Sequence, residues 1–380
     1  MSARQPFPFG RRLADVLRRR RGRRGNPGQQ RRPGAGDGGR RHRTGRAVSG
    51  RRAPEAPGRV PAVAAGPTRP VRVLVTGATG FLGRWVTEAF AALGDHVTTF
   101  PGRELGMAAA GPGRALRRAV AEVDAVCHLA AVTPLQPGPR AARTYARCNV
   151  DATRLLLDAV AGTSRCRVVF ASTAMVAGLG PTGRHSDRVA YAESKRAAEE
   201  LVERYGFGVS LRLNALGGPR TPTDRGIVAA ALRAAAEDRP FDVYGDGSSG
   251  RDYLHVLDAA RAVVGAARRP VAGYQAVEIG SGRLSTIDAV LTTVERVTRR
   301  RVQRRHLPER ADVDDRPACD LRRARAVLDW SPRRSALATL VGDQWAEQQE
   351  PGTFSACLRW TLDPSGRPLT IVTPRAGGRP

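Results

Sequence analysis

A glycine-rich segment directly after an apolar run constrains this fold more than any other feature of the chain. Residues 71–75 are apolar apart from one arginine, and the next eight read Thr-Gly-Ala-Thr-Gly-Phe-Leu-Gly, ahead of a stretch of helical period. In such a turn the glycines permit a tight bend, close approach of a pyrophosphate and close packing of the helix, whose free N–H groups attract phosphate. The segment therefore predicts a dinucleotide cradle formed by Thr76, Gly77, Thr79, Gly80, Phe81, Leu82 and Gly83.

The following chain alternates short β-branched or apolar runs with longer stretches of helical period. Helices between successive strands predict right-handed crossovers and hence a parallel sheet. The expected fold class is therefore α/β, with a doubly wound parallel sheet. The expected strands after the first are residues 97–100, 125–129, 168–171 and 209–213, and the expected helices are residues 83–93, 115–123, 144–161 and 191–205.

The same patterns divide the chain into regions. Residues 71–213 are expected to form the nucleotide-binding domain, to which residues 252–280 return. Residues 214–345 are expected to form mainly a smaller, loop-rich lobe over the sheet that holds the substrate. In residues 346–380, apolar side chains alternate with period two from Phe354 onward, reach the turn sequence Asp-Pro-Ser-Gly and then resume. This C-terminal extension is predicted to contain a hairpin.

The N-terminal tail, residues 1–70, differs sharply in composition. The net charge of the chain is +28, and this tail holds 19 arginines against three acids. Because a stretch so rich in Arg, Gly and Pro cannot bury enough apolar surface to offset its ordering entropy, we expect it to be disordered. Two explanations stay open: an inert extension, such as one from a start codon placed too far upstream, or an arm that contacts polyanion phosphates. Since its only aromatics are two phenylalanines, base stacking and hence nucleic-acid binding are not expected.

Cysteine, histidine and hydropathy patterns exclude further classes. The five cysteines are odd in number and widely spaced, and neither they nor the six histidines form a metal-ligand pair. This pattern argues against a disulfide scaffold and a structural zinc. No window approaches the roughly 20 apolar residues needed to span a bilayer, and no apolar export signal follows the first arginines. We therefore expect a cytoplasmic protein without a metal site or a membrane partner.

A tyrosine and a lysine carry the candidate chemistry. Tyr191 and Lys195 lie four residues apart at the start of a predicted helix and so share one face, and Lys195 is the only lysine among 63 basic residues. An ammonium near the phenol, aided by a cationic nicotinamide, lowers the tyrosine pKa toward that of a usable base. Thr173 ends a predicted strand, where its hydroxyl is placed to bond the substrate oxygen. These three are the candidate catalytic residues; Thr173 and Tyr191 are also predicted to contact the substrate, and Tyr191 and Lys195 the cofactor.

The end of the second predicted strand bears on the choice of cofactor. Folds that prefer NAD place an acid there to bind the adenosine ribose, whereas an arginine accommodates the 2′-phosphate of NADP. Here the strand runs into Pro-Gly-Arg103 without that acid. Arginine is abundant in this chain, so both NAD and NADP stay open, with Arg103 favouring NADP.

Together these elements resemble the extended short-chain dehydrogenases/reductases, in particular their NAD(P)-dependent sugar-nucleotide epimerase/dehydratase branch. The likeness covers residues 71–345 and includes three further motifs. They are His-Leu-Ala-Ala at 128–131, Asn-Val-Asp-Ala-Thr at 149–153, and Gly-Asp-Gly-Ser-Ser-Gly-Arg-Asp-Tyr at 245–253. The resemblance implies a Rossmann-type fold and a nucleotide-linked sugar as substrate.

The resemblance also assigns roles to particular residues. It implies that Arg251 contacts the nucleotide diphosphate, in agreement with the bidentate fit of a guanidinium to phosphate. It implies a homodimer, for which the predicted helices 115–123 and 144–161 are candidates. The cofactor contacts that it adds are Leu129, Ala130, Ala131 and Asn149.

Departures from the family pattern reduce the number of reactions that this chain is expected to catalyse. Dehydratases of this branch carry Asp-Glu after the catalytic threonine, whereas Ala-Met follows Thr173 here, which argues against a sugar 4,6-dehydratase. Only 17 residues separate Thr173 from Tyr191, so one substrate loop is shortened. In the family's Arg-x-x-Asn-Val-Tyr-Gly-Pro segment, Asn214 stands one place early and Ala215 occupies the asparagine position. Asn214 is kept as a candidate substrate contact, and the identity of the sugar is left open.

The primary expectation is an oxidoreductase that moves hydride at C4 of a nucleotide-linked sugar, as in a sugar-nucleotide 4-epimerase. In it Tyr191 transfers the hydroxyl proton, Lys195 holds the nicotinamide ribose and Thr173 polarises the oxygen. An NADPH-dependent ketoreductase of nucleotide-linked 4-keto-deoxyhexoses would use the same residues and stays the alternative. A polyanion binder acting through the tail is a more distant one. The intact set of three residues argues against a redox sensor or scaffold.

Overall fold

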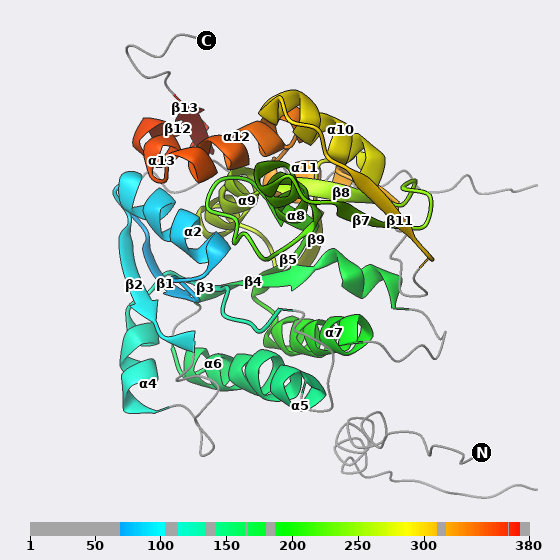
Figure 1. Ribbon diagram of the computed structural model, residues 1–380. Helices are drawn as coiled ribbons and strands as arrows, with labels where there is room; N and C mark the ends of the chain where they lie inside the picture. Colours follow the sequence, from blue (N-terminus) through cyan, green and yellow to red (C-terminus); the bar gives the residue numbers. More distant parts are fainter. Residues whose placement is uncertain are drawn as a thin grey trace, which may run out of the picture. The chain divides into compact units, whose positions relative to one another are not determined.

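A six-stranded parallel sheet forms the centre of the computed structural model, in the order β2-β1-β3-β4-β5-β9 (Figure 1). The structure describes residues 69–102, 113–133, 141–163, 166–179, 187–309, 317–363 and 365–372. Arg103 and residues 1–68 of the predicted tail lie outside these ranges. The strands are β1 (Arg72–Thr76), β2 (His96–Phe100), β3 (Ala125–His128), β4 (Arg167–Thr173), β5 (Gly208–Leu213) and β9 (Tyr274–Ile279).

The order of these strands creates a switch point between β1 and β3. The chain runs outward from β1 to β2 and then returns to β3 on the other side of β1. In the parallel pairing of β1 with β3, Thr76 lies opposite His128, so both strands end at the same edge. Ligands of open α/β sheets bind in the crevice outside such strand ends. The α/β class and the doubly wound parallel sheet predicted from the sequence are thereby confirmed.

Helices cover both faces of the sheet. On one face lie α2 (Phe81–Ala92) and α9 (Val256–Arg268), and on the other lie α4 (Arg114–Ala121), α6 (Ala152–Val160) and α7 (Asp187–Tyr205) (Figure 1). The inner strands β1 and β3 are almost entirely buried, because each side of them meets a helix layer, whereas the edge strand β2 is largely exposed. In β1, for example, Val73 and Val75 belong to the core under α2 and α9, whereas Leu74 belongs to the core under the other layer.

The helix predicted over residues 144–161 is composite. It consists of α5 (Ala141–Tyr145), a π-helical segment η2 (Ala146–Asp151) and α6. A π turn accommodates one extra residue and shifts the side chains that precede it around the helix axis, and such turns often occur at functional sites. This one contains Asn149, which the sequence predicted to lie at the cofactor site.

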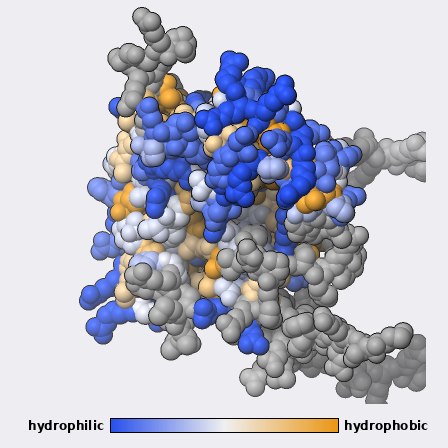
Figure 2. Space-filling model, viewed as in Figure 1, coloured by the Kyte–Doolittle hydropathy of each residue, from blue (hydrophilic) through white to orange (hydrophobic). Residues whose placement is uncertain are grey.

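The chain after β5 builds a smaller unit with its own core. It contains a three-stranded sheet, β10-β8-β6, and a parallel pair, β11-β7. The strands are β6 (Ala215–Gly217), β7 (Phe241–Tyr244), β8 (Gly250–His255), β10 (Leu284–Thr286) and β11 (Arg304–Leu307), and the helices are α8 (Ile227–Glu237), α10 (Ile287–Thr298), α11 (Arg322–Leu328) and α12 (Leu337–Gln349). Side chains from α8, α10 and α12 pack together, while α11 packs on β9. Hydrophilic residues gather over α10 and β11, next to the arginine-rich run 299–305 (Figure 2).

The C-terminal segment packs back onto the helix layer of α2 and α9. It contains α13 (Thr353–Cys357) and an antiparallel pair, β12 (Leu358–Leu362) with β13 (Pro368–Val372). The period-two pattern predicted from Phe354 onward is wrong for its first part, because Phe354 and Ala356 lie in α13. Phe354 in α13 and Leu358 at the start of β12 are both buried in the core with Trp360, so the same apolar positions fit a short helix followed by a strand. In the described part of the chain no helix is both long and apolar enough to cross a membrane.

Candidate active site

The glycine-rich turn between β1 and α2 has no room for side chains. Gly77 has a φ of +74°, and a Cβ placed on it would lie 2.6 Å from the backbone nitrogen of Ala130. A Cβ on Gly83 would lie 2.0 Å from the carbonyl oxygen of Gly77. The turn is closed by a hydrogen bond of 3.0 Å from the Gly80 N–H to the Gly77 carbonyl. Glycine is therefore required for steric reasons, and the backbone stays open to a ligand at the start of α2.

The residues of this turn offer backbone rather than side-chain groups. Gly80 is the N-cap of α2 and is exposed, and no side chain among the described residues caps the helix. Phe81 and Leu82 pack into the core, so only their N–H groups remain available at the helix start. Free N–H groups at a helix N-terminus bind phosphate. The cradle therefore fits the pyrophosphate of a dinucleotide.

A chain of buried polar groups ties the cradle to the loop after β3. The Ala130 N–H donates to the Thr76 hydroxyl (3.3 Å), and the Thr153 hydroxyl donates to the Asn149 carbonyl (2.7 Å). The only hydroxyl proton of Thr153 is used in its bond to Asn149, so Thr153 accepts from the Nε2–H of His128 (3.0 Å). The Nδ1 atom of the neutral His128 ring then has no proton and accepts from the Thr76 hydroxyl (2.7 Å). Burial, aided by nearby Lys195, lowers the pKa of His128 to about 3, in agreement with a neutral ring. His128 thus holds the ends of β1 and β3 against the helix η2–α6.

The Asn149 side chain extends this chain to the candidate catalytic helix. Its amide oxygen accepts from the Val132 N–H (2.8 Å), and its amide nitrogen donates to the Val132 carbonyl (3.0 Å) and to the Ser194 hydroxyl (3.0 Å). The Ser194 hydroxyl donates to the Tyr191 carbonyl at 2.7 Å. Thr76 and Asn149 were predicted to contact the cofactor. Because their polar side-chain atoms have protein partners, we expect them also to position the loops and α7, and their contact with the cofactor stays a prediction.

Tyr191 lies in a small apolar cluster at the carboxyl edge of the sheet. Its ring packs edge-on against Tyr145 with 5.8 Å between centroids, and Met175 and Val132 complete the cluster. Met175 belongs to the short 3₁₀ helix η3 (Ala174–Gly178), which Thr173 caps by accepting from the Met175 N–H at 3.3 Å. The structure thus brings the end of β4, the loop after β3 and the first turns of α7 together around the phenol.

Lys195 lies one helical turn further along α7 and reaches β4. Its ammonium donates to the Ala171 carbonyl at 2.7 Å and lies 4.6 Å from the centre of the Phe170 ring. The side chain is almost completely buried. Ala171 is two residues before Thr173, so Thr173, Tyr191 and Lys195 lie near the same edge of the sheet, and their catalytic roles stay a prediction.

Burial displaces the pKa values of both residues. It raises the pKa of Tyr191, as does the neighbouring Tyr145, and lowers the pKa of Lys195 to about 7, with Glu199 opposing the change. In the cofactor-free protein Tyr191 is therefore a protonated phenol. To act as a base it needs additional positive charge, which an oxidised nicotinamide would bring.

We expect Lys195 to make the stability of the cofactor-free protein depend on alkaline pH. The pKa in the unfolded chain is about 10.4. Between about pH 7 and pH 10 the unfolded state therefore binds more protons, so the free energy of unfolding rises with pH by a few kcal/mol in this window. Below about pH 7 Lys195 is charged in both the folded and the unfolded state, so the full free-energy cost of burying its ammonium lowers stability there. Urea unfolding from pH 6.5 to 10 should show this rise in the wild type, and the rise should be absent in Lys195→Met. If the free energy of unfolding changes with pH equally in both proteins, the prediction is contradicted.

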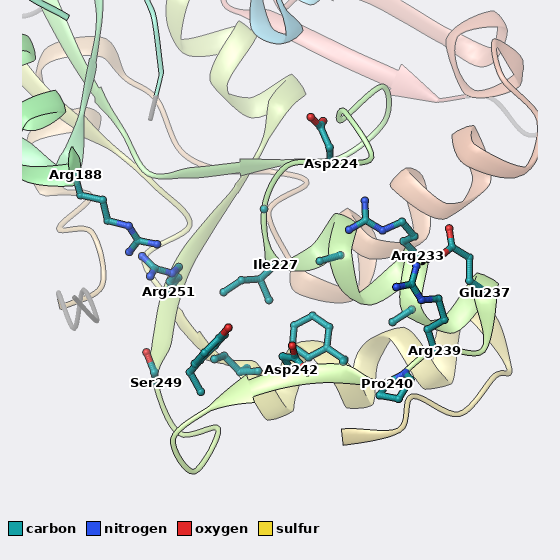
Figure 3. Close-up of a pocket in the computed structure, with 16 residues that line it drawn as sticks. Arg188, Asp224, Ile227, Arg233, Glu237, Arg239, Pro240, Asp242, Ser249 and Arg251 are labelled. Carbon is teal, nitrogen blue, oxygen red and sulfur yellow. Dashed lines mark hydrogen bonds and ion pairs between the residues drawn. The ribbon is translucent and has the colours of Figure 1, made fainter. Parts of the chain in front are cut away.

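A second part of the site is a cavity of about 560 Å³ in the unit after β5 (Figure 3). Arg251 of β8 lines it, and its contact with the nucleotide diphosphate stays a prediction. Arg188, Arg233 and Phe241 also line it, and the sequence analysis did not single them out. The helix predicted over residues 191–205 begins earlier in the structure, because α7 starts at Asp187, and this extension places Arg188 three residues before Tyr191 on the same helix.

Asn214 is placed differently from the other predicted substrate contacts. Its amide nitrogen donates to the Ile279 carbonyl (3.2 Å) and to Glu278 (3.3 Å), across the junction of β5 and β9. It is not among the residues that line the cavity. We therefore expect Asn214 to hold the sheet edge, and direct contact with substrate stays a prediction. Leu129, Ala130 and Ala131 are partly buried in the loop after β3, beside Gly77.

A dinucleotide cradle combined with a tyrosine and a lysine one helical turn apart is typical of the short-chain dehydrogenases/reductases. The additional unit after β5 is typical of the extended members of that class. The sequence model of the NAD dependent epimerase/dehydratase family matches residues 73–280. The chain belongs to this family. Within the described part of the chain no group of His, Cys, Asp and Glu is placed to hold a metal ion.

Several relatives are named for activity on UDP-sugars. The chain is 27% identical to the UDP-glucose 4-epimerase of Streptomyces lividans over 316 residues, which cover 72% of this chain and 95% of that protein. It is 28% identical over 226 residues to the UDP-glucuronate 4-epimerase of Thermodesulfobacterium geofontis, covering 56% of this chain and 69% of that protein. The solved structure of MoeE5 in complex with UDP-glucuronic acid and NAD superposes with a TM-score of 0.63 at 26% identity, covering 73% of this chain and 99% of that one.

Proposed function

We propose that this chain is an NAD-dependent 4-epimerase of a UDP-linked hexose. The observation that carries the proposal is the meeting of the dinucleotide cradle, Tyr191 and Lys195 at one sheet edge, with the Arg251-lined cavity in the adjoining unit. The UDP-sugar relatives and the NAD held by MoeE5 support the choice of substrate and cofactor.

The residues of the chain divide the work. When bound, the nicotinamide supplies hydride transfer at C4. Tyr191 takes the proton from the C4 hydroxyl during oxidation and returns it during reduction. Lys195 contributes positive charge at this edge, and Thr173 donates to the same sugar oxygen. The apolar cluster with Tyr145 and Met175 excludes water from the phenol.

An epimerase also needs to present either face of the keto intermediate to the same hydride donor. The sugar therefore has to turn while the nucleotide stays bound. A cavity whose anchoring arginine is on β8, in a different unit from Tyr191 on α7, suits this separation of anchoring from chemistry.

Cofactor analysis and turnover assays test the function together. We expect NAD to co-purify and UDP-glucose or UDP-glucuronate to equilibrate with its C4 epimer without net consumption of cofactor. Stoichiometric oxidation of NADPH with a nucleotide-linked 4-keto sugar would instead establish the ketoreductase. In that case Arg103→Ala should lower the preference for NADP over NAD. The cytoplasmic location and the homodimer expected from the sequence belong to this proposal, and light scattering of the purified protein tests the dimer.

A further inference from the structure

Arg220 has a backbone conformation that an arginine rarely adopts. Its φ is +62°, and the other described non-glycine residues with a positive φ are Asp238, Arg299 and Asp329. Each of those three ends a helix (α8, α10 and α11), where a left-handed residue is common. Arg220 instead lies third in the turn 218–221, which a hydrogen bond of 3.2 Å closes from the Thr221 N–H to the Gly218 carbonyl. Glycine or asparagine is favoured at a turn position with positive φ, so an arginine held there indicates a role for its side chain.

The side chain of Arg220 crosses to the helix that carries the dinucleotide cradle. Its guanidinium carbon lies 4.2 Å from the centre of the buried Trp85 ring of α2, and its Nη1 donates to Glu88 at 2.6 Å. In the opposite direction, the Nε1–H of Trp85 donates to the Pro219 carbonyl at 3.3 Å. Phe354 of α13 packs edge-on against the same indole, with 6.4 Å between ring centroids. The turn is therefore fastened to α2 by contacts that run both ways.

The turn begins a segment, residues 218–226, that we call the bridging loop. Its later part belongs to the unit after β5, because the Thr223 carbonyl accepts from Arg233 of α8 at 3.0 Å and Gly226 is the N-cap of that helix. Asp224 and Gly226 line the cavity, and Figure 3 shows Asp224 beside it. The bridging loop therefore has one end on the cofactor helix and the other end at the cavity.

We propose that Arg220 is a positioning residue, which sets the separation of bound cofactor and bound sugar by fastening the bridging loop to α2. The proposal rests on the proposed function. Hydride transfer needs the nicotinamide and C4 of the sugar at a set separation, and an error of about 1 Å can lower the rate about 100-fold. Arg220 belongs neither to the cradle nor to the residues that line the cavity. Its loss should therefore affect the chemical step and leave the binding of each ligand unchanged.

Turnover of UDP-glucose and UDP-glucuronate by Arg220→Gly tests this role. Glycine removes the side chain and suits the left-handed backbone, so the turn should persist. We expect kcat to fall on the order of 10- to 100-fold, while NAD content, KM and UDP affinity measured by calorimetry stay close to wild type. Arg220→Lys should recover part of kcat, because an ammonium still pairs with Glu88 but lacks the planar group that lies over Trp85.

Arg299→Gly is the matched control. It makes the same substitution at another left-handed arginine, with a φ of +59°, at the end of α10. Because the control removes an arginine and relieves the backbone in the same way, it should keep the wild-type kcat. Circular dichroism and urea unfolding establish that each variant is folded.

Amide hydrogen exchange, read by mass spectrometry, tests the fastening without any substrate. In wild type, NAD binding should slow exchange in α2 and also in the bridging loop, because Arg220 joins the two. In Arg220→Gly the slowing should remain in α2 and be lost from the bridging loop. In Arg299→Gly it should appear in both segments.

The outcomes separate this inference from the proposed function. If Arg220→Gly keeps the wild-type kcat, the inference fails while the function stands. If kcat, NAD content and UDP affinity fall together, Arg220 only supports the fold and the inference is overturned. If wild type binds NAD but turns over no UDP-sugar, the proposed function fails, and an unchanged response of the bridging loop in Arg220→Gly would separately overturn the inference.

Discussion

Tyr191→Phe is expected to lower kcat roughly 10³-fold, the range that one general acid-base group contributes. Tyr191 packs in a cluster with Tyr145, Val132 and Met175. Within this cluster, the proposed mechanism uses only the Tyr191 hydroxyl for proton transfer. Phenylalanine fills the same space, so the packing of the ring against Tyr145 should persist. NAD content and UDP binding should therefore stay close to wild type, and single-turnover assays should show that the loss lies in the chemical step.

Tyr205→Phe is the control for this substitution. Tyr205 ends the same helix, and its hydroxyl donates to the Cys166 carbonyl at 2.6 Å, away from the cavity and the cradle. Its loss should cost about 1 kcal/mol of stability and leave kcat unchanged. If Tyr191→Phe keeps more than a tenth of the wild-type kcat, another group moves the proton and the assignment of Tyr191 is wrong.

The central sheet could be predicted because its signals are local. Most of its strands are short apolar or β-branched runs, and their expected bounds agree with β2, β3, β4 and β5 to within one or two residues at each end. The spacing of the glycines likewise predicted the turn, whose φ at Gly77 and contact with Ala130 require glycine. Structural features that depend on the residue pattern of a single segment can therefore be predicted from the sequence.

The missed features depend on contacts between distant segments. The π turn of η2 is a shift of one residue within an otherwise regular helical pattern, and periodicity does not detect it. Thr76 and Asn149 make hydrogen bonds to groups 17 to 54 positions away, which a motif alone does not reveal, and their contact with the cofactor stays a prediction. The cavity likewise depends on the folded arrangement, because it is lined by Arg188 of α7 and Arg251 of β8.

The C-terminal segment shows why a short pattern is ambiguous. Phe354 and Leu358 are spaced for one helical face and also for every second position of a strand. Gly352, with a φ of +87°, is the N-cap from which α13 starts, and the strand begins only at Leu358. Both patterns bury the same two side chains, so burial alone could not decide between them.

Gly77→Ala is expected to lower NAD affinity on the order of 10- to 100-fold, the scale of losing a backbone hydrogen bond to a charged pyrophosphate. The new Cβ would lie 2.6 Å from the backbone nitrogen of Ala130 and 2.8 Å from the carbonyl carbon of Leu129. Neither backbone atom belongs to a flexible side-chain end, so the turn or the loop after β3 must move. Because the Ala130 N–H also bonds Thr76, that movement would disturb the polar chain through His128 to Asn149.

Gly94→Ala separates this clash from backbone strain. Gly94 has nearly the same φ, +78°, but a Cβ there would meet nothing within 4 Å among the described residues. Alanine at either position carries the cost of a left-handed backbone, roughly 1–2 kcal/mol, so both variants should unfold at lower urea concentration. Only Gly77→Ala should lose NAD, measured by titration of the cofactor-free protein. If both variants bind NAD as wild type does, the turn tolerates displacement and its backbone is not the pyrophosphate ligand; if both lose it equally, strain alone explains the effect.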